Sequence, residues 1–209
     1  MASVYAEWDV GTFTVRKDTR VYFLDSTTHD QEQRNCVGTI WMCNPGTKYE
    51  SGSKKVRLKT SLRWGRWPGS DLDETIKIIV AVIEEAKRQA ALHNRVMGQE
   101  DYVEVLNLFY LCESERDKAL KQLRRLSPYC ESPCQNPRFS WLAWGDDPPA
   151  ALIPPLNSLK NPFFYSLRDK CLIRRTPTNH ESALHPWASL PRPELCYQQL
   201  IAAYISSLL

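Results

Sequence analysis

Asparagine and histidine side chains stand at the ends of apolar segments in this chain of 209 residues. The apolar run 37–43 stops at Asn44, a second run stops at Asn107, and a late loop contains His185. An asparagine amide offers a hydrogen-bond donor and an acceptor, and a neutral histidine can donate to an oxygen that gains negative charge. These groups could orient a water molecule and bind the edge of a heterocyclic base.

Cleavage of a glycosidic bond would need groups of this kind. The reaction builds positive charge on the sugar and negative charge on the leaving base, so Asn44 could orient the attacking water while Asn107 and His185 bind the base. Each residue also has a plainer interpretation. Asn44 begins Asn-Pro-Gly, an ordinary turn sequence, Asn107 could cap a turn, and a lone histidine is usually structural. Asp146 and Asp147 could supply catalytic carboxylates instead, although a turn is the simpler role for them.

Apolar and amphipathic segments alternate along the chain, which predicts an α/β fold, a three-layer α/β/α sandwich with a central, mainly parallel sheet. A hairpin is expected first, with strands at 13–16 and 20–24 around a turn at 17–19. The further strands are expected at 37–43, 102–109, 139–145 and 171–174. The first helix is expected to run from a cap at Asp71 or Asp73 to Gly98. Further helices are expected at 115–126, 164–170 and 194–209.

Composition indicates a globular protein, with 43% hydrophobic and 24% charged residues. We expect one domain over 1–209, with an N-terminal hairpin and loop at 1–36, a motif-bearing core at 37–190 and a C-terminal helix at 194–209. The chain begins without a signal-like segment, and its apolar stretches are shorter than a membrane span. These features predict a cytoplasmic monomer that contacts no membrane.

The cysteine count is seven, an odd number, which favours free, buried thiols in a reducing compartment. Cys130 and Cys134 are closely spaced, so a zinc or iron–sulfur site is the alternative for them. No second pair of matching spacing accompanies them. The expectation is therefore a protein with no metal and no cofactor.

Four short motifs follow one another in an order that resembles the uracil-DNA glycosylase superfamily. They are Asn44-Pro45-Gly46, Val105-Leu106-Asn107, Trp144-Gly145 and His185-Pro186. The chain is also similar to an uncharacterised family of bacterial and phage proteins with Asn-Pro-Ser-Thr, Val-Asn-Leu-Phe, Ala-Trp-Gly and His-Pro-Leu motifs. The resemblance spans roughly residues 37 to 190.

The resemblance implies roles for individual residues. Asn44 would position the attacking water, Asn107 would bind the base edge, and His185 would approach the base from a loop that presses into the minor groove. In the same loop, Pro186 and Trp187 would contact DNA. The remaining base-contacting candidates are Gly46, Trp64, Trp67 and Phe109, and the phosphate-contacting candidates are Lys54, Lys55, Arg57, Arg63, Arg66, Arg174 and Arg175.

The expected function is that of a monofunctional DNA glycosylase, a hydrolase that flips a damaged or modified base out of single- or double-stranded DNA and leaves an abasic site. Trp187 stands where the family has a serine after His-Pro, so the base could be uracil or a modified pyrimidine such as hydroxymethylated or glucosylated phage cytosine. Excision of a phage base would be antiviral defence. The alternatives are a non-catalytic module that binds nucleic acid or nucleotides, and a nucleoside hydrolase.

Overall fold

The computed structural model describes residues 3–10, 14–23, 35–43, 63–67, 72, 74–98, 101–108, 118, 121, 134, 136–145, 159–166, 168–178, 183 and 194–209. The strands are β1 (Ser3–Val10), β2 (Thr14–Tyr22), β3 (Asn35–Met42), β4 (Arg63–Trp67), β5 (Asp101–Asn107), β6 (Phe139–Leu142), β7 (Pro162–Ser166) and β8 (Cys171–Ile173). The helices are α1 (Glu74–Leu92) and α3 (Glu194–Leu208). These elements form an α/β fold.

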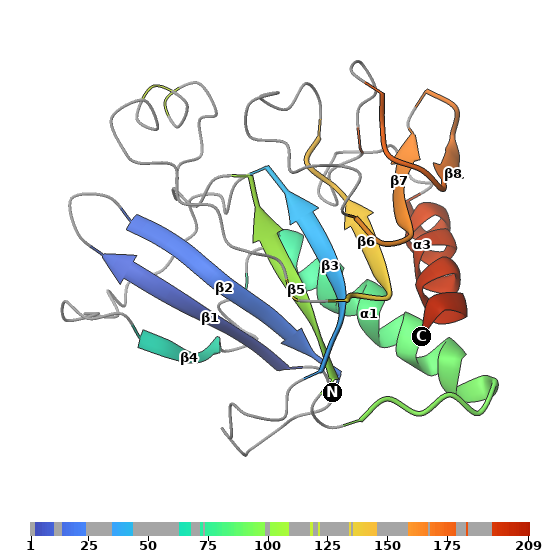
Figure 1. The fold of residues 1–209 in the computed structure, drawn as a ribbon, viewed down its shortest axis with the longest axis horizontal. Helices are drawn as coiled ribbons and strands as arrows, with labels where there is room; N and C mark the ends of the chain where they lie inside the picture. The colour runs from blue at the N-terminus through green and yellow to red at the C-terminus, as the bar shows by residue number, and fades with distance from the viewer. Residues whose placement is uncertain are drawn as a thin grey trace.

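The strands form one mixed, 8-stranded sheet in the order β4-β1-β2-β5-β3-β6-β7-β8. Four neighbouring strands (β5, β3, β6 and β7) are parallel, and their arrows all point to the top of Figure 1. The antiparallel strands lie outside them. Among the parallel strands, the chain starts at β3, moves to β5 on one side and then to β6 and β7 on the other. Ligands in open α/β sheets bind beyond the carboxyl ends of the strands where the order reverses, which is between β3 and β6 here.

Both described helices contribute to one apolar core on the same face of the sheet. The buried stripe of α1 includes Ile76, Ile79 and Ile83, whose spacing of three and four residues keeps them on one side of the helix. They join sheet residues such as Ile40 and Val105 in this core. Figure 1 shows α1 passing behind the parallel strands and α3 beside it.

The other face of the parallel strands is buried as well. Trp41, Leu106 and Leu142 alternate with the residues of the first core, so they point to the opposite face, and each is at most 2% exposed. They belong to a second apolar cluster, with Leu108, Trp144 and Phe164 among its members. Burial on both faces is typical of parallel strands, because the connections between them place helices on the faces of the sheet.

Most of the expected elements are confirmed with small shifts in their bounds. The predicted strands at 37–43, 102–109, 139–145 and 171–174 correspond to β3, β5, β6 and β8, and the predicted C-terminal helix corresponds to α3. In the predicted helix at 115–126, the described residues Lys118 and Lys121 are helical.

The expected end of the first long helix at Gly98 is wrong. The helix ends at Leu92, and Asn94 has a φ of 58°, in the left-handed region that asparagine tolerates better than most residues. The backbone N–H of Arg95 then donates to the carbonyl of Ala90 at 3.1 Å, which closes the last turn. Asn94 therefore stops the helix four residues before the glycine.

Two further expectations are corrected. The predicted hairpin turn at 17–19 lies inside β2, because this segment is paired with β1 on one side and with β5 on the other from Thr19 onward. The predicted helix at 164–170 is instead strand β7, followed by a turn. Its aromatic residues favour a strand, and Phe163 and Phe164 are buried on opposite faces of the sheet.

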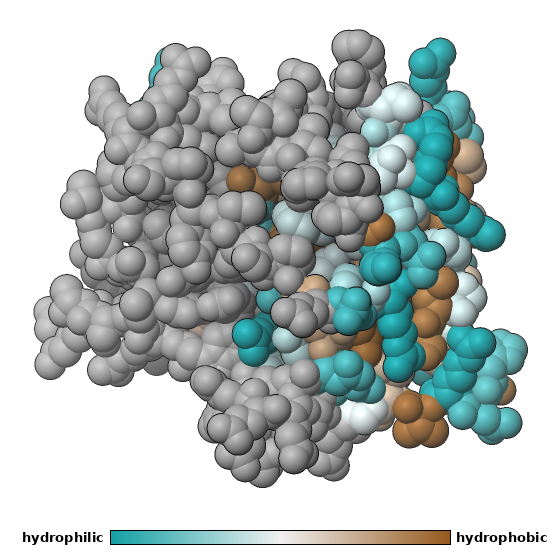
Figure 2. Space-filling model, viewed as in Figure 1, coloured by the Kyte–Doolittle hydropathy of each residue, from teal (hydrophilic) through white to brown (hydrophobic). Residues whose placement is uncertain are grey.

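On the face of the molecule that Figure 2 shows, the described surface is mainly hydrophilic, with small apolar patches. The large apolar side chains exposed among the described residues are Leu92, Val96 and Leu200. None of the described helices is long and apolar enough to span a membrane.

An ion pair on α1 gives the fold a testable dependence on pH. Hydrogen bonds from Arg88, at 2.6 and 2.8 Å, and from Gln89 lower the pKa of Glu85 from 4.5 to about 2. A carboxyl with a lowered pKa stabilises the fold above its unfolded pKa and loses that effect as the pH falls to its folded pKa. Glu85→Gln should therefore lower the Tm at pH 7 by no more than roughly 2–4 °C, because exposed ion pairs contribute little stability.

The measurement for Glu85 is the Tm of both proteins between pH 7 and pH 2. The difference should shrink from about pH 4.5 downward and vanish near pH 2. A Tm difference that stays constant over this range would show that the ionised carboxylate contributes nothing.

Candidate functional site

The carboxyl ends of β5, β3 and β6 lie side by side. Met42 of β3 pairs with Asn107 of β5, and Trp41 pairs with Leu142 of β6. The pairing continues past the strand ends, because the N–H of Leu108 donates to the carbonyl of Met42, and the N–H of Ala143 donates to that of Trp41, each at 2.8 Å. The segments that leave these three strands are thus held together by backbone hydrogen bonds.

Among the described residues, Asn107 places a polar side chain at this edge. It is 1% exposed, and neither its amide nitrogen nor its amide oxygen has a hydrogen-bond partner among the described residues. Leaving a buried donor or acceptor unsatisfied costs about 1–3 kcal/mol, so such groups in folded proteins call for an explanation. A role in binding a polar ligand is one explanation that fits the position of Asn107 in the sheet.

Trp144 and Gly145 lie just beyond the end of β6. Trp144 is 2% exposed and packs in the second apolar cluster, and its indole nitrogen has no hydrogen-bond partner among the described residues. Gly145 has a φ of 86°, a backbone conformation that residues other than glycine rarely adopt. Its N–H donates to the carbonyl of Ala183 at 2.7 Å, and the N–H of Ala183 donates back at 3.3 Å. Ala183 is therefore held beside the segment that follows β6.

The structure describes residues of two of the four sequence motifs, and only sequence neighbours of the other two. Asn107 is at the site itself, and Trp144 and Gly145 follow the second strand away from it. Cys43, the residue before Asn44, directly follows β3, and Ala183 stands two positions before His185. The predicted site residues that lie outside the described residues are Asn44, Gly46, Lys54, Lys55, Arg57, Phe109, His185, Pro186 and Trp187, together with Asp146 and Asp147.

The other predicted residues lie away from the end of β5. Arg63, Trp64, Arg66 and Trp67 belong to β4, which pairs with β1 at the outer edge of the sheet. Since β1 and β2 separate β4 from β5, its backbone lies three strand spacings, about 14 Å, from that of Asn107. The structure therefore does not bring the backbone of Trp64 and Trp67 next to Asn107.

Arg174 and Arg175 follow β8 and are exposed. The guanidinium of Arg174 lies 4.7 Å from the centre of the Tyr204 ring, and that of Arg175 lies 5.9 Å from the centre of the Phe164 ring. Nη1 of Arg175 also donates a hydrogen bond to the carbonyl of Thr176 at 2.9 Å. Both side chains are thus positioned on the surface at the β8 side of the parallel strands.

Sequence reasoning missed a disulfide bond. Cys36 and Cys134 form a disulfide, so the expectation of free thiols is wrong for these two residues. They are separated by 98 positions, and no spacing rule links cysteines so far apart. Cys43 and Cys171 are thiols, the first buried and the second exposed, while Cys130 lies outside the described residues.

Comparison with known proteins identified no match to this chain. No protein-family model, no curated protein and no solved structure matches the chain. The function has to be inferred from the residues and their geometry.

Proposed function

We propose that this chain is a monofunctional DNA glycosylase that hydrolyses the N-glycosidic bond of a flipped base and leaves an abasic site. The observation that carries the proposal is the buried amide of Asn107, which has no hydrogen-bond partner among the described residues. It lies at the carboxyl end of β5, beside β3 and thus next to the position between β3 and β6 where an open α/β sheet binds ligands. An amide carries a donor and an acceptor, which matches the alternating donors and acceptors on the edge of a pyrimidine.

The finer fold belongs to the same proposal. We propose a three-layer α/β/α sandwich in which the four parallel strands form the centre of the sheet. The burial of Trp41, Leu106 and Leu142 supports a layer on the face opposite α1 and α3.

The reaction requires a water molecule on one side of the sugar and hydrogen-bond donors at the leaving base. Asn44 comes two positions after Met42, which pairs with Asn107, and we assign Asn44 to the water. His185, two residues after Ala183, is assigned to the base oxygen that becomes negative. Because asparagine is a weak base, the water would attack a bond that is already dissociating.

The partner would be DNA, and the base uracil or a modified pyrimidine such as a hydroxymethylated or glucosylated cytosine. Flipping the nucleotide costs a few kcal/mol, which contacts to phosphates would offset. Arg174 and Arg175 are the described candidates for these contacts. Excision of a phage base would make the protein an antiviral enzyme. We propose that it is cytoplasmic, works as a monomer and needs no cofactor.

The test is incubation of the purified chain with uracil-containing DNA and, separately, with glucosylated phage DNA, followed by cleavage of abasic sites with alkali. Alkali-labile sites on one substrate, with unmodified DNA as the control, are the expected result. DNA binding without abasic sites on either substrate would overturn the enzymatic proposal in favour of a binding module. Release of bases from free nucleosides but not from DNA would indicate a nucleoside hydrolase.

Asn44→Ala separates catalysis from binding. Removing one transition-state hydrogen-bonding group from an enzyme commonly lowers kcat on the order of 100- to 1000-fold. We expect a loss of this size in abasic-site formation, with the Kd for substrate DNA changed by less than about 3-fold, because a water-orienting residue makes no ground-state contact with DNA. Single-turnover assays and a DNA-binding titration measure the two quantities. Unchanged turnover would remove Asn44 from the mechanism.

A further inference from the structure

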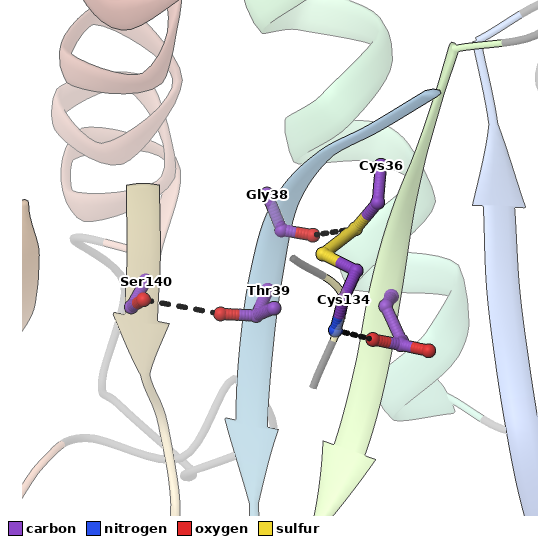
Figure 3. Close-up of a disulfide and its surroundings, with 6 residues drawn as sticks. Cys36, Gly38, Thr39, Cys134 and Ser140 are labelled. Atoms are coloured by element: carbon purple, nitrogen blue, oxygen red, sulfur yellow. Dashed lines mark hydrogen bonds between the residues drawn. A yellow bond between two sulfur atoms is a disulfide. The ribbon is translucent and has the colours of Figure 1, made fainter. Parts of the chain in front are cut away.

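Two cysteines and a glutamate from separate segments meet on the sheet face opposite α1 and α3. Cys36 lies at the start of β3, Glu104 lies in β5, and Cys134 precedes β6. One sulfur or carboxylate oxygen from each lies within 4.8 Å of the other two. Figure 3 shows the disulfide between Cys36 and Cys134, with Gly38 and Thr39 of β3 beside it.

Cys36 and Glu104 are buried, Cys134 is partly buried, and hydrogen-bond and sulfur contacts link the cluster to the backbone. Cys36 is 8% and Glu104 5% exposed. A carboxylate oxygen of Glu104 accepts a hydrogen bond from the backbone N–H of Cys134 at 3.0 Å, and the sulfur of Cys36 lies 3.4 Å from the carbonyl oxygen of Gly38. The carboxylate of Glu104 is thereby held toward the cysteines.

Among the described residues, Arg20 places a positive charge beside this cluster. Arg20 of β2 pairs directly with Glu104 across the sheet, and its guanidinium lies 5.0 Å from the centre of the Tyr102 ring. Arginine is effectively always protonated in proteins. Arg20 therefore stays charged and balances the carboxylate of Glu104.

We infer that Cys36, Cys134 and Glu104 bind one zinc ion when the disulfide is reduced. Thiolate sulfur and carboxylate oxygen are both ordinary zinc ligands, and three protein ligands leave a fourth, tetrahedral position for water. Two thiolates, one carboxylate, the Zn²⁺ ion and the guanidinium of Arg20 together carry no net charge. This neutrality matters because a buried group of unbalanced charges is costly.

Metal binding is then an alternative to the disulfide. A dithiol reductant gives two electrons and two protons to the disulfide, which yields two thiols in the chain and a disulfide in the reductant. Zinc binding displaces the two thiol protons to solvent, because only the thiolate is a ligand. A disulfide oxidant reverses the process, takes up the two electrons and releases zinc. The site lies at the amino ends of β3 and β6, away from the carboxyl ends that bear Asn107.

Cobalt(II) is the probe for this site, because thiolate ligands give bound cobalt an intense near-ultraviolet charge-transfer absorption. The chain is reduced, freed of metal and titrated with Co²⁺, and then with Zn²⁺. We expect the absorption to saturate at one cobalt per chain and to disappear when zinc displaces the cobalt. The oxidised chain should show no such absorption. Equal cobalt absorption by the reduced and oxidised chains, or none by either, would overturn the inference.

Single substitutions assign the ligands. Cys36→Ser and Cys134→Ser should abolish the absorption of the reduced chain, and Glu104→Gln should weaken zinc binding at least about 10- to 100-fold, the loss usual for removal of even an outer-shell partner. Cys171→Ser is the matched control, since Cys171 is an exposed thiol outside the cluster, and it should bind cobalt as the wild type does. Loss of the absorption in Cys171→Ser would show that the metal binds elsewhere.

A second measurement uses the wild-type chain and does not depend on the folding of any variant. The reduced, zinc-loaded chain is oxidised with a small disulfide, and free zinc is followed with a chromogenic chelator. Release of one zinc per chain, in step with the loss of two thiols, is the expected result. Zinc that stays bound after the Cys36–Cys134 disulfide has formed would contradict the inference.

Discussion

Replacing Asn107 by leucine is expected to make the protein more stable and inactive. Leucine has nearly the shape of asparagine, and the substitution removes two buried polar atoms that have no hydrogen-bond partner among the described residues. Since an unsatisfied buried polar group costs about 1–3 kcal/mol, the free energy of unfolding should rise by up to that amount. For a chain of this size the Tm should rise by roughly 2–4 °C for each kcal/mol.

Thr39→Val is the matched control for this substitution. Thr39 is also buried in the parallel strands, but its hydroxyl forms a hydrogen bond with that of Ser140 at 3.1 Å, which Figure 3 shows. Valine has the same shape and leaves the Ser140 hydroxyl without this partner, so the free energy of unfolding should fall by about 1–3 kcal/mol. Denaturant titrations of both variants give the comparison. A loss of stability in Asn107→Leu would mean that the amide is a structural group rather than a binding group.

Gly38→Ala is expected to destabilise the fold severely. Gly38 of β3 pairs with Phe139 of β6, and a Cβ atom at Gly38 would overlap the Phe139 ring. The ring is fully buried and packs against Phe163, with ring centres 6.2 Å apart, so it has little room to move. Overpacking of this kind costs about 1–3 kcal/mol and occasionally more. Thermal unfolding of the variant should show a lower Tm or no cooperative transition.

A double variant tests the reason for this loss. Phe139→Leu removes part of the ring, so the double variant with Gly38→Ala should be more stable than Gly38→Ala alone, although Phe139→Leu destabilises the wild type. Such a non-additive result is the signature of two residues in direct contact. Additive losses, or a Gly38→Ala variant as stable as the wild type, would contradict the steric explanation.

The parallel centre of the fold could be predicted from sequence because its signals are local. The apolar runs that became β3 and β5 are bounded by polar residues, and α1 has an apolar stripe with charged residues on its other side. The strands nearer the edges of the sheet were harder to predict. The segment 17–19 looks like a turn, yet it lies in β2, because backbone pairing with neighbouring strands outweighs the local preference of its residues.

Part of the candidate site was also predictable. Polar residues that follow buried parallel strands meet at one edge of the sheet, so Asn107 and the segment after Trp144 could be expected together. The order of strands could not be predicted, because β4 reaches the outer edge by pairing with β1, far from it in sequence. The cluster of Cys36, Cys134 and Glu104 could not be predicted for the same reason. Its members come from three segments that become neighbours only in the folded sheet.

The most direct test of the proposed glycosylase is the release of free base from DNA, identified by mass spectrometry, by the wild type and by Asn107→Leu at equal concentrations. The wild type should release a pyrimidine from uracil-containing or glucosylated DNA, in equal amount to the abasic sites formed. The more stable Asn107→Leu variant should release it on the order of 100- to 1000-fold more slowly. No base released by the wild type, or equal rates for the two proteins, would contradict the assignment of Asn107 as the base-binding residue of a glycosylase.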